Sequence, residues 1–344
     1  MHRTHIAACT LLLAAALPAQ ADIAVDIAPD RAALGKRDEV LVTVTLTNTG
    51  SAPERLLKWR TPFVAPEAAL FDITRDGQPV RYLGRKVKRA APAEADFISL
   101  APGESRSARV ELSSTYDMAV TGAYSVRYRL PALETVAKAG GGAVRSNTAA
   151  IWIEGRMARG TASPAVAAPA GGLMGSLTYA QCSNAQQDTI ASAMAAGAEM
   201  AAGGLAYLTS GKEQARRYTN WFGALDGPRQ ATVTNNFTAI KDAFLTKPVK
   251  VDCGCDEDYF AYVYPGQPYT IHVCKAFWAA RLTGTDSMGG TLLHELSHFD
   301  VVAGTDDHVY GQSGAADMAR TAPQRAINNA DSHEYFGENT PPLN

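Results

Sequence analysis

A motif near the C-terminal end, His294-Glu295-Leu296-Ser297-His298, constrains this 344-residue chain more than any other feature. Residues four apart lie on the same face of an α-helix, so His294 and His298 can direct two imidazoles at one metal ion. Glu295 lies beside the first histidine, where a carboxylate can take a proton from a metal-bound water. The motif predicts a helix with a catalytic zinc site, in preference to a helix that displays two surface histidines.

A catalytic zinc ion takes three protein ligands and leaves a fourth position for water. Gly304 stands where the extended pattern H-E-x-x-H-x-x-G-x-x-H would have its third histidine. The same glycine suits a left-handed residue at a helix end, after which the chain can fold back towards the metal. The remaining candidates for the third ligand are the nearby Asp306, Asp307 and His308, and the more distant Glu334 and Glu338.

Residues 304–311 read Gly-Thr-Asp-Asp-His-Val-Tyr-Gly and fit the pattern G-T-x-D-x-x-Y-G. Together with the HExxH motif, this pattern resembles the deuterolysin and peptidyl-Lys metalloendopeptidase family, the aspzincins. Position by position, the resemblance implies that Asp307 is the third metal ligand and that Tyr310 donates a hydrogen bond to the oxyanion of the tetrahedral intermediate. Asp306 is then expected to be a solvated turn residue, and His308 a surface or supporting histidine.

The segment Asn328-Asn329-Ala330-Asp331 also resembles this family, in which it lines the pocket for the residue after the scissile bond. In lysine-specific members an aspartate and a glutamate three residues later bind the ammonium group, and these positions fall on Asp331 and Glu334. Such a pair on one helical turn would attract lysine more than an apolar side chain. The alternative is a solvated acidic helix end, and His333 is expected to be exposed.

These residues predict metal-assisted peptide hydrolysis with one zinc ion per chain. Zinc held by His294, His298 and Asp307 would lower the pKa of its bound water and polarise the peptide carbonyl. Glu295 would take the proton and later deliver it to the leaving amine, while Tyr310 would stabilise the oxyanion.

The N-terminal residues 1–21 predict a secretory signal peptide. Basic residues precede an apolar run from Ile6 to Leu17, and Ala19-Gln20-Ala21 is a small-x-small cleavage signal. The apolar run is too short to span a bilayer. We therefore expect an exported protein, cut after Ala21.

The charge balance is near neutral, with 32 basic and 34 acidic residues, and predicts no nucleic-acid or membrane partner. The length allows two domains of ordinary size. The expected partners are protein or peptide substrates and the chain's own propeptide, and the mature protein is expected to be a monomer.

Residues 22–154 are expected to form an immunoglobulin-like β-sandwich. Apolar and polar residues alternate in 40–47, 107–112 and 124–130, and turn-forming residues such as Asp76-Gly77 separate these runs. This spacing is typical of an antiparallel sandwich. No motif in this half assigns it a function.

Residues 155–175 are rich in Gly, Ala, Ser and Pro, and predict an interdomain linker that is open to cleavage. Since an active endopeptidase endangers the cell that makes it, we expect this linker to contain the maturation site of a zymogen. The N-terminal half would then be a propeptide that assists folding and covers the cleft.

Residues 176–344 are expected to form an α+β metalloprotease domain. Ser183 and Gln186 form a capping box that opens an Ala-rich helix running to Gly203 or beyond. Further helices are predicted at 212–222, 231–245, 289–302 and 312–329. Short strands are predicted at 249–252, 259–264 and 269–273, with His272 as an ordinary sheet residue.

Four cysteines remain after export, an even number that implies two disulfides. Three pairings are possible, and a second zinc site on the thiolates is a weaker alternative. The family resemblance implies Cys182 with Cys253 and Cys255 with Cys274.

Two other classes of function compete with a protease. One is a secreted adhesion or binding protein whose metal site is purely structural, and the other is a zinc amidase that does not cleave proteins. Glu295 and Tyr310 count against the first, because binding zinc requires neither.

Overall fold

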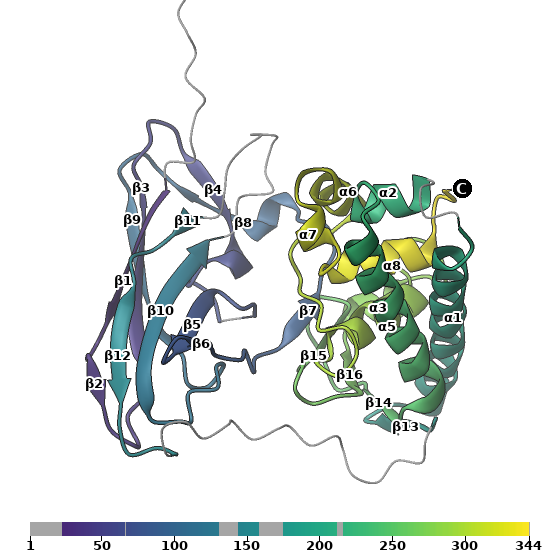
Figure 1. The fold of residues 1–344 in the computed structure, drawn as a ribbon, viewed down its shortest axis with the longest axis horizontal. Coiled ribbons are helices and arrows are strands. Elements are labelled where there is room, and N and C mark those ends of the chain that lie inside the picture. Colours follow the sequence, from purple (N-terminus) through teal and green to yellow (C-terminus); the bar gives the residue numbers. More distant parts are fainter. Residues whose placement is uncertain (1–22, 66, 131–143, 158–174, 212–215, 344) are drawn as a thin grey trace, which may run out of the picture.

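The computed structural model describes residues 23–65, 67–130, 144–157, 175–211 and 216–343. The expected signal peptide and most of the linker, with its maturation site, lie outside these residues. Among the described helices, none has the length and apolar character needed to cross a bilayer. Figure 1 shows two bodies side by side, one made of strands from the N-terminal half and one made of helices around a small sheet.

The N-terminal body is built from strands and two short 3-10 turns, Lys58–Arg60 and Glu94–Asp96. The strands are β1 Ile23–Pro29, β2 Ala33–Leu34, β3 Leu41–Asn48, β4 Glu54–Leu57, β5 Phe71–Arg75, β6 Gln78–Pro79, β7 Lys86–Lys88, β8 Phe97–Leu100, β9 Ser105–Glu111, β10 Gly122–Leu130, β11 Val144–Arg145 and β12 Ala149–Ile153.

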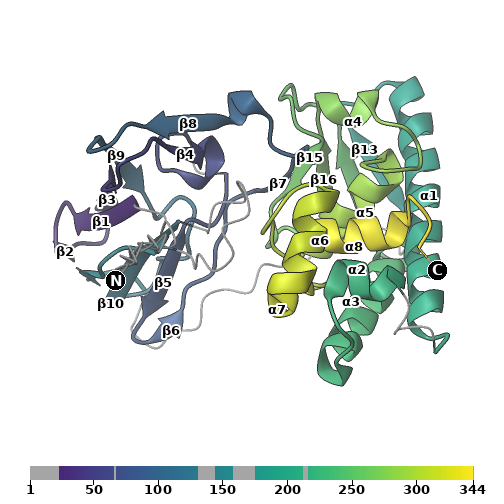
Figure 2. The ribbon, with the colours of Figure 1, turned by 90° about the horizontal axis from the view of Figure 1, so that it is seen from above.

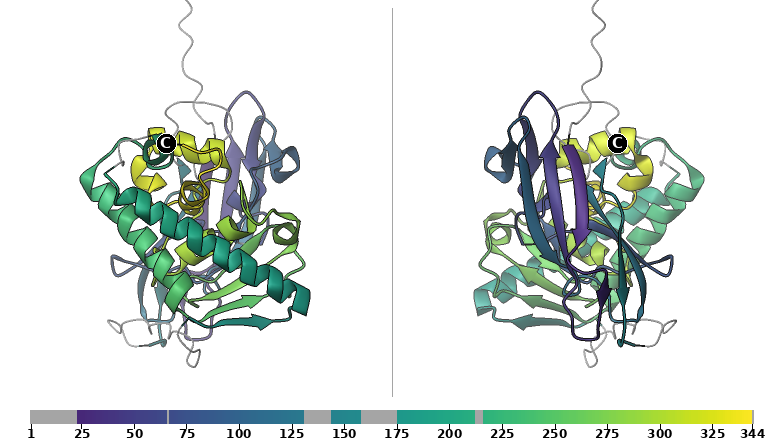
Figure 3. Two further views of the ribbon diagram at one scale, coloured as in Figure 1. Left: turned by 90° about the vertical axis from the view of Figure 1, so that its right-hand side faces the viewer. Right: turned by 90° about the vertical axis from the view of Figure 1, so that its left-hand side faces the viewer.

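Alternation of apolar and polar residues gives these strands one buried face. In β10, Tyr124, Val126 and Tyr128 are buried while the residues between them are more exposed. One sheet has the order β1-β3-β9, and a second has the order β2-β12-β10-β5-β6, with β11 paired to β10. Their inward side chains share one core, and the first sheet faces the viewer in the right panel of Figure 3. The immunoglobulin-like classification stays a prediction.

The C-terminal body mixes helices with short strands. In chain order they are β13 Leu177–Ala180, α1 Asn184–Leu208, α2 Arg216–Phe222, α3 Gly227–Thr246, β14 Val249–Asp252, β15 Ala261–Val263, β16 Thr270–Val273, α4 Lys275–Ala279, α5 Met288–His298, α6 Gln312–Thr321, α7 Pro323–Ala326 and α8 Ala330–Glu338. The expected mixture of helices with one small sheet is therefore observed.

Helix boundaries follow local chemistry. The predicted capping box at Ser183 is present, and α1 continues to Leu208. The helix expected to reach 302 ends at His298, although Gly304 does take the left-handed φ of 59°. The helix expected over 312–329 divides at Ala322, because Pro323 lacks an N–H and begins α7 instead. Strand β13 and helix α4 were not expected.

Helix α5 is buried along its whole length, since all of its residues lie inside the C-terminal body. The long helix α1, which runs across the front of the left panel of Figure 3, packs against it. The two backbones meet at Gly197 and Gly289, where an added Cβ at Gly289 would lie 3.0 Å from the Gly197 nitrogen. Two glycines therefore permit the approach that buries the HExxH helix.

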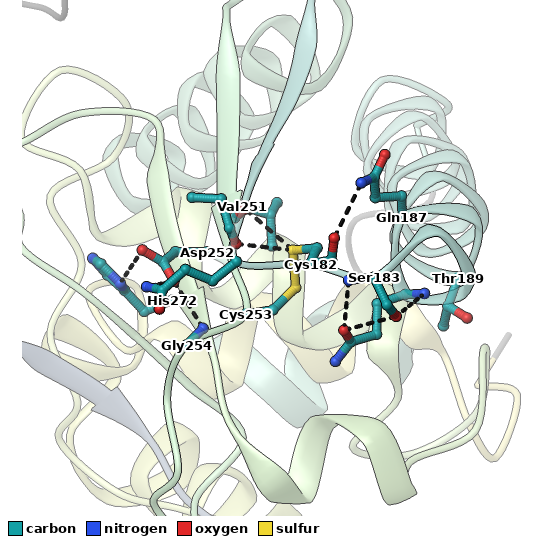
Figure 4. The surroundings of a disulfide bond; sticks show 12 residues. Cys182, Ser183, Gln187, Thr189, Val251, Asp252, Cys253, Gly254 and His272 are labelled. Carbon is teal, nitrogen blue, oxygen red and sulfur yellow. Dashed lines mark hydrogen bonds and ion pairs between the residues drawn. A yellow bond between two sulfur atoms is a disulfide. The ribbon is translucent and has the colours of Figure 1, made fainter.

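Both expected disulfides are present, joining Cys182 to Cys253 and Cys255 to Cys274. Figure 4 shows the first of them tying the start of α1 to the end of β14. His272 stacks on Tyr262 with ring centroids 4.4 Å apart, as an ordinary sheet residue would. Because both disulfides oxidise all four sulfurs, the alternative of a second zinc site on cysteine thiolates is excluded.

Strand β7 crosses from the N-terminal body into the C-terminal sheet, whose order is β13-β14-β16-β15-β7. It runs antiparallel to β15, with Lys88 opposite Ala261, Val87 opposite Tyr262 and Lys86 opposite Val263. Figure 2 shows it next to β15, away from the other N-terminal strands. No sequence pattern predicted this exchange.

Candidate active site

The metal-ligand candidates converge at the C-terminal end of α5. Ser287 caps this helix by accepting a hydrogen bond from the Gly290 N–H at 3.0 Å. His294 and His298 lie one turn apart, fully buried, with their Nε2 atoms 3.1 Å from each other. Asp307 Oδ1 lies 3.0 Å from the first Nε2 and 3.2 Å from the second. The structure thus brings together the three residues named as ligands.

The loop that carries Asp307 is fixed by the segment before α8. Asp306 N donates to the Asn328 carbonyl, and the buried Asn329 side chain accepts from the backbone N–H groups of His308 and Val309 at 3.0 and 3.2 Å. From the sequence, Asn329 is expected only to line a pocket. In the structure its side-chain amide also holds the loop that positions the Asp307 carboxylate.

Hydrogen bonds at the far side of each ring fix the tautomers of the two histidines. His298 Nδ1 lies 2.8 Å from the Thr305 carbonyl oxygen, which can only accept, so this nitrogen carries the proton. His294 Nδ1 lies 3.1 Å from both Asp331 Oδ1 and Glu334 Oε2. Both Nε2 atoms are then free to bind a metal.

The three ligand atoms suit a single divalent cation. Two unprotonated nitrogens and a carboxylate oxygen within 3.2 Å of one another have no proton to share among them. Ligands about 2.1 Å from a tetrahedral zinc ion lie about 3.4 Å apart, close to the separations here. Two imidazoles and one carboxylate form a donor set that favours zinc or a neighbouring transition metal.

Glu295 is fully buried, and both of its carboxylate oxygens lack a hydrogen-bond partner among the described residues. Burial raises the pKa of this carboxyl well above its usual range. A buried carboxyl with no partner is costly in a purely structural site. It is suited to exchanging a proton with a bound molecule.

The backbone of Val87, the residue before Lys88, lies between Asp307 and Tyr310. Tyr310 donates its hydroxyl to the Val87 carbonyl oxygen at 2.8 Å, and Val87 N–H donates to Asp307 Oδ2 at 3.2 Å. Burial raises the pKa of the Tyr310 hydroxyl well above its usual range, so it remains a donor. A main-chain carbonyl therefore already occupies the place where Tyr310 can donate.

Lys88 follows Val87, and its side chain extends into an acidic pocket formed by Asp331 and Glu334. Its Nζ lies 3.1 Å from Asp331 Oδ1 and 2.8 Å from Glu334 Oε2, and all three side chains are fully buried. Burial opposes the charge on Lys88, but these two carboxylates hold its pKa well above the usual value. The interpretation of Asp331 and Glu334 as a solvated helix end is therefore wrong.

His294, Asp331 and Glu334 also lie close enough together to hold a metal ion. The Lys88 ammonium, however, contacts the same Asp331 and Glu334 oxygens that face His294. A second cation beside it would be repelled. In this structure the second cluster therefore holds the Lys88 ammonium group.

Four other expectations are corrected or decided here. His333 is fully buried, not exposed, because Phe237 stacks on it and Asn236 and Asn329 bond its ring nitrogens. Asp306 is half-exposed as a turn residue should be, but it pairs with Lys86 at 2.7 Å. His308 bonds Asn328 and not the ligand cluster.

Glu338, considered as a third ligand, instead accepts hydrogen bonds from Ser287 at the start of α5. Burial, followed by the charge of Glu334, raises the pKa of Glu338 to about 8.

Comparison with known proteins gives a consistent result. A family model described as lysine-specific metallo-endopeptidase, the aspzincin M35 model, matches residues 207–338. An "Extracellular protease" of Aeromonas hydrophila is 46% identical over 90% of this chain and 91% of its own length. A "Peptidyl-Lys metalloendopeptidase" of Armillaria mellea is 36% identical, with 87% of each chain covered. Among solved structures, a zinc peptidase from Grifola frondosa is 42% identical over 47% of this chain and all of its own, with a TM-score of 0.46.

Proposed function

Since the chain belongs to the aspzincin M35 family of lysine-specific metallo-endopeptidases, we propose that it is a secreted zinc endopeptidase, made as a zymogen, that cleaves peptide bonds before lysine. One observation carries the proposal. A lysine of the N-terminal body fills the pocket of Asp331 and Glu334, and the residue before it, Val87, contacts Asp307 through its N–H and Tyr310 through its carbonyl oxygen. This is the arrangement that a bound substrate would need.

His294, His298 and Asp307 would hold the zinc ion, with the tautomers fixed by Thr305 and by the acidic pocket. When bound, zinc supplies a Lewis acid that polarises a carbonyl and acidifies a water molecule. No further His, Cys, Asp or Glu of the described residues joins this cluster, so these three residues would leave a fourth position to water.

Glu295 acts as the general base and then as the acid. Its two carboxylate oxygens have no hydrogen-bond partner among the described residues, so they are available to take a proton from water and deliver it to the leaving amine. Tyr310 stabilises the oxyanion, because its hydroxyl already donates to the carbonyl oxygen of the residue before a lysine. Both roles depend on atoms that lie in one small buried region.

The preference for lysine follows from charge in a closed pocket. Two buried carboxylates of the pocket, Asp331 and Glu334, would be left without their counter-charge by an uncharged side chain. A lysine restores it, as Lys88 does. We expect apolar residues after the scissile bond to be poor substrates.

The N-terminal body, residues 22–154, acts as an inhibitory propeptide by inserting β7 into the cleft. Its contacts extend beyond Lys88, since Arg60 donates to the backbone carbonyls of Asp307 and His308 and Lys86 donates to the Thr305 carbonyl. Cleavage in the 155–175 linker would free the catalytic body of its covalent tie. Secretion through residues 1–21 fits the two disulfides.

A peptide library tests the proposal directly. The full chain is expressed, allowed to mature, and incubated with peptides that vary at every position around the scissile bond. We expect cleavage before lysine that stops on adding a strong chelator and returns with zinc. Cleavage without preference would refute the lysine assignment, and cleavage that resists chelation would refute the zinc mechanism. The uncut chain should be inactive under the same conditions.

A further inference from the structure

Three carboxylates, not two, surround the Lys88 ammonium. Besides Asp331 and Glu334, Asp286 Oδ1 lies 2.8 Å from Nζ. The ammonium group donates hydrogen bonds to Asp286 and Asp331, and Glu334 Oε2 lies 2.8 Å away as a third negative charge. Charge-assisted bonds of this kind are the strong ones. The rings of Tyr335 and Phe260 lie 5.3 and 5.6 Å from Nζ and cover the remaining sides.

Contacts other than Lys88 also hold Asp286 in position. It has the left-handed φ of 50°, directly before Ser287, which caps α5. Its N–H donates to Glu338 Oε2 at 3.2 Å, and its Oδ1 accepts the Tyr335 hydroxyl at 2.9 Å. A carboxylate held at both its backbone and its side chain needs little reordering to bind a ligand.

Asp286 differs from its two neighbours in one respect. The oxygens of Asp331 and Glu334 that meet Lys88 also lie 3.1 Å from His294 Nδ1. Of the three carboxylates that pair with Lys88, Asp286 alone has no described hydrogen bond or ion pair to His294, His298 or Asp307, since its other bonds go to Glu338 and Tyr335. Changes at Asp331 or Glu334 therefore disturb recognition and the metal site together, whereas changes at Asp286 act on recognition.

We propose that Asp286 is a specificity-determining residue that binds the ammonium group of the lysine after the scissile bond. This inference rests on the function proposed above and adds a residue that the family motifs do not contain. Lys88 stands in for the substrate lysine. In the substrate complex, Asp286 joins Asp331 and Glu334 to complete the set of three carboxylates around the ammonium group.

The test compares Asp286→Asn with the wild type and with Asp317→Asn, a matched change at an exposed aspartate of α6. Asparagine tolerates a left-handed backbone as aspartate does. Each protein is expressed as the full chain and purified after maturation. Peptides with lysine or the uncharged isostere norleucine after the scissile bond are then cleaved. We expect the lysine to norleucine ratio of kcat/KM to fall about tenfold to a hundredfold in Asp286→Asn, mainly through KM.

A second readout uses the uncut chain and does not depend on activity. Amide hydrogen exchange at residues 86–88 should be faster in Asp286→Asn, because Lys88 loses one of the three negative charges that surround it. Asp286→Gly, which also accepts a positive φ, should give the same result. Asp317→Asn should exchange as the wild type does.

An unchanged lysine to norleucine ratio in an otherwise active Asp286→Asn enzyme overturns the inference. If the wild type cleaves neither peptide, the proposed function falls, and the exchange measurement alone decides whether Asp286 binds the ammonium group. Unchanged protection of residues 86–88 in both variants would then overturn it.

Discussion

The metal cluster contains His294, and the lysine pocket lies against the other side of the same ring. The two sites are nevertheless built in different ways. The cluster takes its ligands from residues 294–307 of one helix and the loop that follows it. The pocket combines Asp286, before that helix, with Asp331 and Glu334 on α8, and a strand of the other body fills it.

The metal cluster is built from residues close together in the sequence, whereas the lysine pocket is built from residues of separate elements. Helix geometry alone brings His294 and His298 together, so two of the three ligands are in place wherever α5 forms. The pocket exists only when α5, α8 and the turn at Asp286 are packed together. We expect changes in the cluster to abolish turnover, and changes in the pocket to alter which substrate is bound and whether the propeptide stays in place.

The largest effect is expected from Glu295→Gln. Losing a general base should lower kcat about a thousandfold, while the metal content stays that of the wild type. Metal analysis together with initial rates on a lysine peptide measures both. Glu199→Gln, at an exposed position of α1, serves as the control. Near-normal turnover in Glu295→Gln would show that Glu295 is not the general base.

Lys88→Met should release inhibition in the uncut chain. Removing one partner of a buried ion pair costs about 3–5 kcal/mol, so activity before linker cleavage should rise at least about a hundredfold. Lys86→Met is the matched control, because Lys86 also contacts the catalytic body but does not enter the pocket. Rates are measured while mass spectrometry shows an intact chain. Equal release by both variants would mean that strand docking, not the pocket, inhibits.

Asp331→Asn tests the boundary between the two regions. Its Oδ1 meets both Lys88 Nζ and His294 Nδ1, so the variant should lose lysine preference and also about tenfold to a hundredfold in zinc affinity. Competition with a chelator of known affinity measures the second loss. Asp286→Asn should keep its zinc affinity. If both variants kept it, the two regions would be independent.

The smallest effect is expected at His333, behind the pocket. Burial lowers its pKa to about 4, against an unfolded value of about 6.5, so its contribution to stability is complete above pH 6.5 and is lost as the pH falls. Between pH 8 and pH 5.5 this amounts to about 1.4 kcal/mol of unfolding free energy. Urea unfolding of the full chain should show that difference between the wild type and His333→Asn. The same pH dependence in both would contradict a neutral buried histidine.

The metal cluster could be predicted from sequence because its spacing is helical and its loop is short. Asp307 was chosen from its neighbours through a family pattern, and the structure places its carboxylate against both imidazoles. The burial of Asp331, Glu334 and His333 could not be predicted from spacing, since it depends on α8 packing against α5 and α3.

The elements missed have a common physical cause. Strand β7 is only three residues long, with two lysines, and is too short for the alternation over about four to eight residues that marks a strand. Its partner β15 lies far away in sequence, and nothing local reports such a pairing. Asp286 stands outside every motif, and only the ammonium beside it identifies its role.

Strand β7 also covers the edge of the C-terminal sheet that β15 would otherwise form. If the N-terminal body leaves after the proposed cleavage, the backbone N–H and C=O groups of β15 that paired with β7 would face solvent and become a template for an extended chain. That template would align an incoming polypeptide beside the ligand cluster. It would equally invite two matured molecules to adhere, so the freed enzyme should be most prone to self-association when peptides are scarce.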